Sequence, residues 1–158
     1  MNVRKCFYAC VASVMLAGSF TSCGDDIETP DIPVNPEGQP KEISGFYILN
    51  RGSNGENNSS IHFYDYATSQ LSADIYQKVN NSSLGESAQQ MLIYGSKIYV
   101  AVTFSNRLAV LDMDGKLLKT IEPEEGGNTM NPRCLAADGG KVYMTYFNGH
   151  AVAALDTV

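Results

Sequence analysis

The sequence has no tryptophan, little positive charge and no stretch in which apolar residues recur with a sustained helical period. Its 11 lysines and arginines are outnumbered by 17 aspartates and glutamates, for a formal net charge of -6, and they do not cluster. Nucleic-acid binding depends on concentrated positive charge, so we expect no nucleic-acid partner. Short apolar runs separated by turns rich in glycine, asparagine and serine predict an all-β chain.

The N-terminus predicts a secreted lipoprotein. Arg4 and Lys5 precede an apolar run at residues 7–17, which is too short to span a bilayer as a helix. Cys23 follows small and polar residues and resembles the bacterial lipobox, where the cysteine thiol is diacylated. We therefore expect a signal peptide at residues 1–22, lipidation of Cys23, and membrane contact through that anchor only. The alternative is a signal cleaved nearby, with Cys23 incidental.

Residues 23–42 predict a tether between this anchor and the folded part of the chain. They contain four of the six prolines, many acidic residues and almost no apolar surface to bury. Asp25, Asp26 and Glu28 resemble the surface-export signal of Bacteroidetes lipoproteins. This favours the outer membrane, facing the cell exterior, although a generic acidic linker would have the same composition.

Catalytic and metal-binding patterns are also lacking. Cys6 and Cys10 leave with the signal peptide and Cys23 takes lipid, so Cys134 has no partner for a disulfide. We expect Cys134 to pack as a small apolar residue on an inner strand. The two histidines, His62 and His150, have no metal-ligand spacing, and no phosphate loop or nucleophile motif is visible. We expect no enzyme activity, catalytic residue, metal or cofactor.

An internal repeat organises the rest of the chain. Residues 94–112 (YGSKIYVAVTFSNRLAVLD) return 44 residues later as residues 138–156 (DGGKVYMTYFNGHAVAALD). Residues 45–50 (GFYILN) and 60–65 (SIHFYD) form a looser, earlier copy of the same two strands. A period of this length is the size of one four-stranded propeller blade.

The repeat predicts three units, at residues 43–88, 89–131 and 132–158. Strands are expected at 43–50, 60–66 and 71–77 in the first unit, at 89–94, 97–103, 107–112 and 116–121 in the second, and at 132–137, 140–147 and 150–156 in the third. Both side-chain sets of the strand at 97–103 are largely apolar, which suits a sheet packed between two others.

Two segments resemble known propeller proteins. Residues 98–112 resemble the YVTN-type repeat, in which a Tyr-Val strand is followed by Ser-Asn, an apolar strand and Leu-Asp. Residues 45–68 resemble the YncE-like surface lipoproteins of gut Bacteroidetes, the class that includes BtuG-type corrinoid binders, although Arg51 stands where Glu is usual. The resemblance implies a propeller of about seven blades. It also implies capture of a small nutrient, with a cobalamin-type corrinoid as best guess, for a TonB-dependent outer-membrane transporter.

About two and a half blades cannot close a propeller ring, which typically needs four to eight. We therefore expect the chain to be an N-terminal fragment of a longer propeller. The alternative is assembly of several copies into one ring.

We expect the ligand site on one rim of such a propeller. The loops at 51–59, 78–87, 104–106, 123–131 and 148–149 fall on it, and they place aromatic rings beside amide groups. That combination suits a flat polar ligand, although asparagine and glycine also serve turn geometry alone. The candidate ligand-binding residues are Asn50, Arg51, Asn54, Asn57, Phe104, Asn106, Arg107, Phe147, Asn148 and His150.

Three other functions remain open. A metal-dependent propeller lactonase or lyase would need ligands on the inner strands, where Gln89, Gln90, Arg133 and Cys134 make a poor metal site. A protein-binding scaffold would need apolar anchors, and Phe104 and Phe147 are the only strong ones on the rim. The chain could also be a truncated fragment without function.

Overall fold

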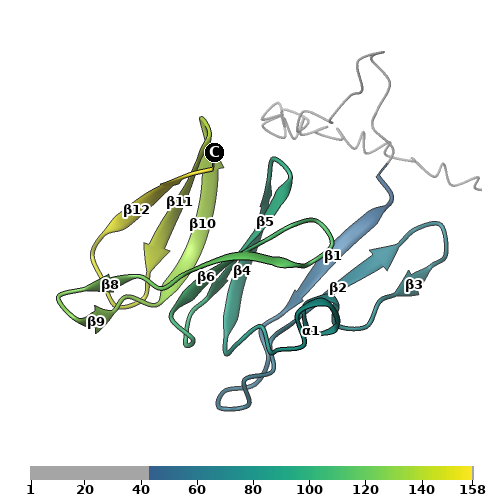
Figure 1. Ribbon diagram of the computed structural model, residues 1–158, viewed down its shortest axis with the longest axis horizontal. Coiled ribbons are helices and arrows are strands. Elements are labelled where there is room, and N and C mark those ends of the chain that lie inside the picture. The colour runs from purple at the N-terminus through teal and green to yellow at the C-terminus, as the bar shows by residue number, and fades with distance from the viewer. Residues whose placement is uncertain (1–42, 158) are drawn as a thin grey trace, which may run out of the picture. The chain divides into compact units, whose positions relative to one another are not determined.

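The computed structural model describes residues 43–157 (Figure 1). The predicted signal peptide, lipidated Cys23 and tether lie outside the described residues. The described part is all-β, as predicted, apart from one short helix. No helix in it is long and apolar enough to cross a membrane.

The first sheet contains β1 (Gly45–Asn50), β2 (Ser60–Asp65) and β3 (Gln70–Leu71), in the order β1-β2-β3. The predicted third strand at 71–77 is wrong beyond Leu71, because Ile75–Asn80 forms the helix α1. Asp74 ends the extended chain, since its carboxylate accepts hydrogen bonds from the Tyr76 and Gln77 backbone amides and caps the helix.

The middle sheet is complete, with four antiparallel strands in sequence order. They are β4 (Ala88–Tyr94), β5 (Lys97–Val102), β6 (Arg107–Leu111) and β7 (Leu117–Ile121). All five residues of β5 after Lys97 are buried, because both faces of this strand are covered. The expectation of a sheet packed on both sides is therefore confirmed for β5.

The third sheet contains β10 (Pro132–Asp138), β11 (Lys141–Tyr146) and β12 (Val152–Asp156). The chain before it was predicted as a plain loop, but β8 (Glu124–Glu125) and β9 (Asn128–Thr129) pair as a small hairpin. Gly126 and Gly127 form its turn with φ values of 59° and 81°, a conformation that glycine adopts without steric cost.

The three sheets pack face to face in a row, as Figure 1 shows. One apolar core lies between the first and middle sheets and includes Ile61, Ile98 and Val100, with Tyr76 of α1. A second core lies between the middle and third sheets and includes Tyr99 and Met144. The middle sheet thus carries a different apolar face to each neighbour.

Cys134 does not pack as predicted, because its residue is exposed on β10. It is the repeat equivalent of Gln90, 44 residues earlier. The Gln90 amide faces the third sheet, where its Nε2 donates to the Leu135 carbonyl over 2.9 Å and its Oε1 accepts from the Leu135 amide over 2.7 Å. Cys134 occupies the corresponding position of the third sheet, where it is exposed among residues 43–157.

Candidate functional site

Backbone hydrogen bonds join the predicted rim loops into one surface. The amides of Thr103 and Phe104 donate to the carbonyls of Ser87 and Glu86, at 3.0 and 3.2 Å. On the next sheet, the Phe147 amide donates to the Asn131 carbonyl at 2.8 Å. In the middle and third sheets, the loop between the second and third strands is therefore fixed to the segment that enters that sheet. This brings residues distant in sequence to one edge of the molecule.

A cleft of about 330 Å³ opens in this surface. We call it the rim cleft; it is lined by Arg51, Gln89, Thr103, Phe104, Arg133 and Phe147. The rings of Phe104 and Phe147 are both about half exposed and meet edge to face, with centroids 6.2 Å apart. Aromatic surface of this kind, left open to solvent, can cover the face of a planar ligand.

Two guanidinium groups give the rim cleft positive charge in an acidic protein. The Arg133 Cζ lies 5.4 Å from the centroid of the Phe147 ring, a cation–π contact that orients its side chain. The Arg51 Nη2 donates to Asn54 Oδ1 at 2.9 Å. Across residues 43–157 the ion pair that forms is Lys141–Asp156, so neither arginine of the cleft is neutralised by a carboxylate. The cleft can therefore receive an anionic group as well as a flat one.

Several predicted site residues hold the rim together instead of facing the cleft. Asn106 adopts φ 45°, its Nδ2 donates to the Pro123 carbonyl at 3.2 Å and its Oδ1 accepts from the Asn131 amide at 2.8 Å. Arg107 donates from Nη2 to the Ser83 carbonyl at 2.9 Å, with a buried Nε that has no protein partner. Asn106 therefore forms a turn and hydrogen-bonds the neighbouring loop, and Arg107 hydrogen-bonds the loop that contains Ser83.

The other predicted residues divide between the cleft's edge and positions away from it. Asn54 supports Arg51 as described, and Asn57 accepts a hydrogen bond from Ser83 through its carbonyl at φ 51°. Asn148 is exposed, and its amide donates to the Met130 carbonyl at 3.1 Å. His150 is exposed as well and does not line the cleft.

Gln89, Thr103 and Arg133 line the cleft although they were not predicted as ligand-binding residues. The repeat holds the signal that would have found them. Gln89 and Arg133 are equivalent positions, 44 residues apart, each at the start of an inner strand, and Thr103 is equivalent to Phe147. The cleft is thus built from corresponding positions of neighbouring sheets.

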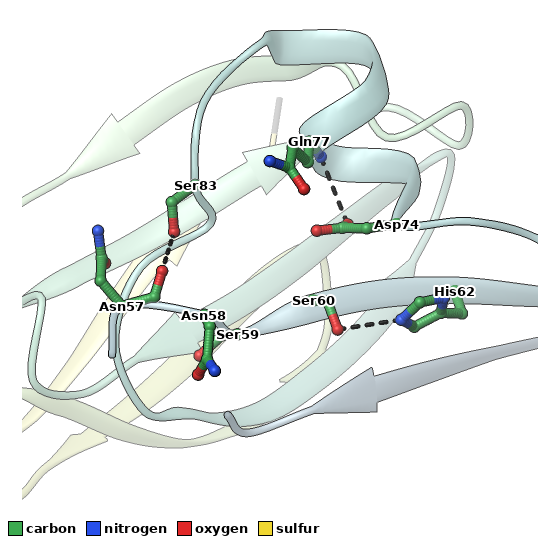
Figure 2. Close-up of a pocket in the computed structure, with 8 residues that line it drawn as sticks. All are labelled: Asn57, Asn58, Ser59, Ser60, His62, Asp74, Gln77 and Ser83. Carbon is green, nitrogen blue, oxygen red and sulfur yellow. Dashed lines mark hydrogen bonds between the residues drawn. The ribbon is translucent and has the colours of Figure 1, made fainter. Parts of the chain in front are cut away.

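A second, more polar cleft of about 260 Å³ lies beside the first sheet (Figure 2). It is lined by Asn57, Asn58, Ser59, Ser60, His62, Asp74, Gln77 and Ser83. His62 of β2 is half-buried here, and both of its ring nitrogens are engaged in hydrogen bonds.

The hydrogen bonds of His62 fix its tautomer. The Ser72 carbonyl, 2.9 Å from Nδ1, can only accept, so Nδ1 carries the proton of the neutral ring. Nε2 then accepts from the Ser60 hydroxyl at 3.0 Å, and that oxygen accepts from Asn50 Nδ2 at 3.2 Å. Neither nitrogen keeps a free lone pair, so this histidine is unsuited to metal binding. More generally, no three His, Cys, Asp or Glu side chains gather as a metal site in the described part of the chain.

Comparison with known proteins gives a family but no curated relative. No curated protein matches the sequence. A family model described as a domain of unknown function, DUF5074, matches residues 44–157, which is nearly the whole of the part that the structure describes. The chain therefore belongs to the DUF5074 family.

Proposed function

We propose that this protein is a cell-surface lipoprotein whose β-propeller domain binds a small nutrient for a TonB-dependent outer-membrane transporter. The rim cleft carries the proposal, since it combines two half-exposed phenylalanines with two arginines that lack carboxylate partners. The N-terminal sequence supports the lipid anchor and the surface location. The lipid anchor is the only membrane contact proposed.

The packing of the sheets supports the propeller. Two successive junctions use corresponding strands, and β10 lies against β4 as neighbouring inner strands would around an axis. A ring of about seven such sheets would extend the rim cleft into a larger bowl. In such a ring the three sheets of residues 43–157 would form one arc.

The chemistry of the cleft favours a planar ligand that carries negative charge or strong hydrogen-bond acceptors. Phenylalanine rings supply contact area, whereas the guanidinium groups of Arg51 and Arg133 supply fixed donors. A cobalamin-type corrinoid has a flat macrocycle, amide side chains and a phosphodiester, so it fits this description. The choice of a corrinoid rests on the sequence resemblance, and the cleft is compatible with it.

Titration calorimetry of cobalamin against the full chain tests the proposal. We expect binding that Phe147→Ala and Arg133→Gln each weaken by about tenfold, since each removes roughly 1.4 kcal/mol of contact. Val79→Ala, an exposed apolar position on α1, serves as the matched control and should bind like the wild type. If cobalamin does not bind, the proposal of a corrinoid ligand is refuted. If cobalamin binds and neither cleft variant weakens it, the rim cleft is not the binding site.

The alternative metal-dependent lactonase or lyase has no specific observation in its favour among residues 43–157. Metal analysis of the full chain after purification without chelators would reveal such a site. A stoichiometric transition metal would favour the enzyme over the binding protein.

A further inference from the structure

The sequence contains two Asn-Gly pairs, Asn54-Gly55 and Asn148-Gly149. In such a pair the backbone amide of the glycine can attack the side chain of the asparagine, because glycine has no Cβ to obstruct the approach. Both asparagines are exposed in loops of the rim surface, so water reaches each of them. The structure nevertheless gives the two pairs different surroundings.

The side-chain oxygen of Asn54 accepts two hydrogen bonds. Arg51 Nη2 donates to Asn54 Oδ1 at 2.9 Å, and the Ser87 hydroxyl donates to the same oxygen at a longer 3.5 Å. Ser87 is buried in the segment that enters the middle sheet. Donors on a carbonyl oxygen stabilise the negative charge that develops there when a nucleophile attacks the carbonyl carbon. The contacts of Asn54 Oδ1 therefore resemble those of an oxyanion hole.

The attacking group in this pair is the Gly55 amide, and it donates to a carboxylate. Its nitrogen lies 2.8 Å from Glu86 Oε1. The backbone of Glu86 is fixed, because its amide donates to Ser105 Oγ at 2.8 Å and its carbonyl accepts from the Phe104 amide at 3.2 Å. A carboxylate within hydrogen-bond reach of a nucleophile can take the proton of that nucleophile during attack. Glu86 is thus placed to act as a general base on Gly55.

The second pair has the same sequence without these contacts. Asn148 Nδ2 donates to the Thr129 carbonyl at 3.5 Å, and among residues 43–157 no arginine or carboxylate hydrogen-bonds to Asn148 or Gly149. Space differs as well. A Cβ built on Gly149 would lie 2.5 Å from Met130 Cε, whereas one built on Gly55 would meet no atom within 4 Å. The backbone at Gly55 therefore has more room to close a ring.

We propose that Asn54-Gly55 is a site of self-catalysed modification, at which Asn54 becomes aspartate or isoaspartate. The Gly55 nitrogen forms a bond to Asn54 Cγ while its proton passes to Glu86, and negative charge collects on Oδ1 beside Arg51. The bond from Cγ to Nδ2 then breaks, Glu86 gives its proton to that nitrogen, and ammonia departs from a succinimide ring. Water opens the ring at either carbonyl. The net reaction converts one amide and one water into one carboxylic acid and one ammonia.

The modification changes the charge of the rim cleft. A carboxylate at position 54 lies where the amide oxygen now accepts from Arg51, so it pairs with that guanidinium. Of the two arginines that line the cleft, Arg133 would then be the one without a carboxylate partner among residues 43–157. Affinity for an anionic ligand should therefore fall as the protein ages. This effect rests on the proposed function, whereas the reaction at Asn54 needs no ligand.

Peptide mass spectrometry on the full chain, incubated at neutral pH without ligand, tests the reaction. Exchange of NH2 for OH changes the mass of the peptide, and chromatography separates aspartate from isoaspartate. The parent protein is incubated both folded and unfolded in urea, so each Asn-Gly pair has its own unfolded reference. Glu86→Gln removes the proposed base and Arg51→Gln removes the nearer donor. Glu56→Gln and Arg133→Gln make the same changes at exposed residues that do not hydrogen-bond to the Asn54-Gly55 pair.

We expect Asn54 to react about tenfold faster than Asn148 in the folded parent protein and at a similar rate in urea, since the contacts that activate Asn54 exist only in the fold. Glu86→Gln and Arg51→Gln should each slow the reaction of folded Asn54 by about tenfold, and the two control variants should react like the parent. The proposal is overturned if folded Asn54 reacts no faster than folded Asn148. It is also overturned if Glu86→Gln or Arg51→Gln leaves the rate unchanged, or if the control variants slow it equally.

Discussion

Replacing Gln90 with alanine should loosen the junction between the middle and third sheets. The inner strands β4 and β10 do not pair through their backbones, and the Gln90 side chain bridges them by imitating a peptide group. It satisfies both the amide and the carbonyl of Leu135, a residue that is 6% exposed. Alanine removes both hydrogen bonds.

The expected loss of stability follows from these two bonds. Each contributes about 1 kcal/mol net, so the free energy of unfolding should fall by about 2 kcal/mol. Gln90 is half-buried, so water can reach the freed Leu135 groups and the full desolvation penalty is not added. With an m-value of about 1.5 kcal/mol per M, the urea midpoint should fall by about 1.3 M.

Urea titration followed by far-UV circular dichroism measures this change in a chain without tryptophan. Gln89→Ala is the matched control, because its exposed side chain is adjacent in sequence and the change should cost under about 0.5 kcal/mol. If Gln90→Ala and Gln89→Ala have the same midpoint, the bridging role assigned to Gln90 is refuted.

Three further predictions concern single hydrogen-bonding side chains. Asp74→Ala should lower the free energy of unfolding by about 1–2 kcal/mol through loss of the α1 cap, while Asp74→Asn should retain most of it; equal urea midpoints would contradict the cap. Asn106→Ala should cost about 2 kcal/mol and speed hydrogen exchange of the Asn131 amide, which would lose its acceptor; unchanged exchange would argue against this contact. The Thr68 backbone amide lowers the pKa of Asp65, so Asp65 contributes stability above pH 3.8 that is lost as pH falls through the lowered value. Acid titrations of the parent and Asp65→Asn proteins should therefore converge at low pH, and parallel curves would exclude this contribution.

Much of the strand order was predictable because the repeated residues include those that alternate between the two faces of each strand. Lys97 and Lys141 begin matching strands, and Tyr99 and Tyr143 occupy matching positions on them. The helix α1 was not predictable from periodicity, since six residues are too few to show a helical pattern. Its determinant is the single carboxylate of Asp74, which binds three backbone amides, one of them from Ile61 on β2.

The candidate site was predictable in its location and less so in its members. Phe104 and Phe147 line the rim cleft, as expected from their position in or beside the loops that the repeat places on one rim. Asn106 was predicted to bind ligand through its side-chain amide. That amide instead hydrogen-bonds the Pro123 carbonyl and the Asn131 amide of the neighbouring loop, a tertiary contact that no local sequence pattern encodes. Arg133 is the second residue of β10, and only its equivalence to Gln89 across the repeat would have indicated that it lines the cleft.

The row of sheets also has a consequence for the order in which the molecule opens. The middle sheet is held on both sides, while the first and third sheets are each held on one side by residues 43–157. In such an array stability is the sum of each unit and its contacts with adjacent units, so unfolding proceeds inward from the terminal units. Amide protons of β5 and β6 should therefore exchange last. The two outer sheets can detach independently, so the rim cleft, which spans the junctions, is lost before the middle sheet unfolds.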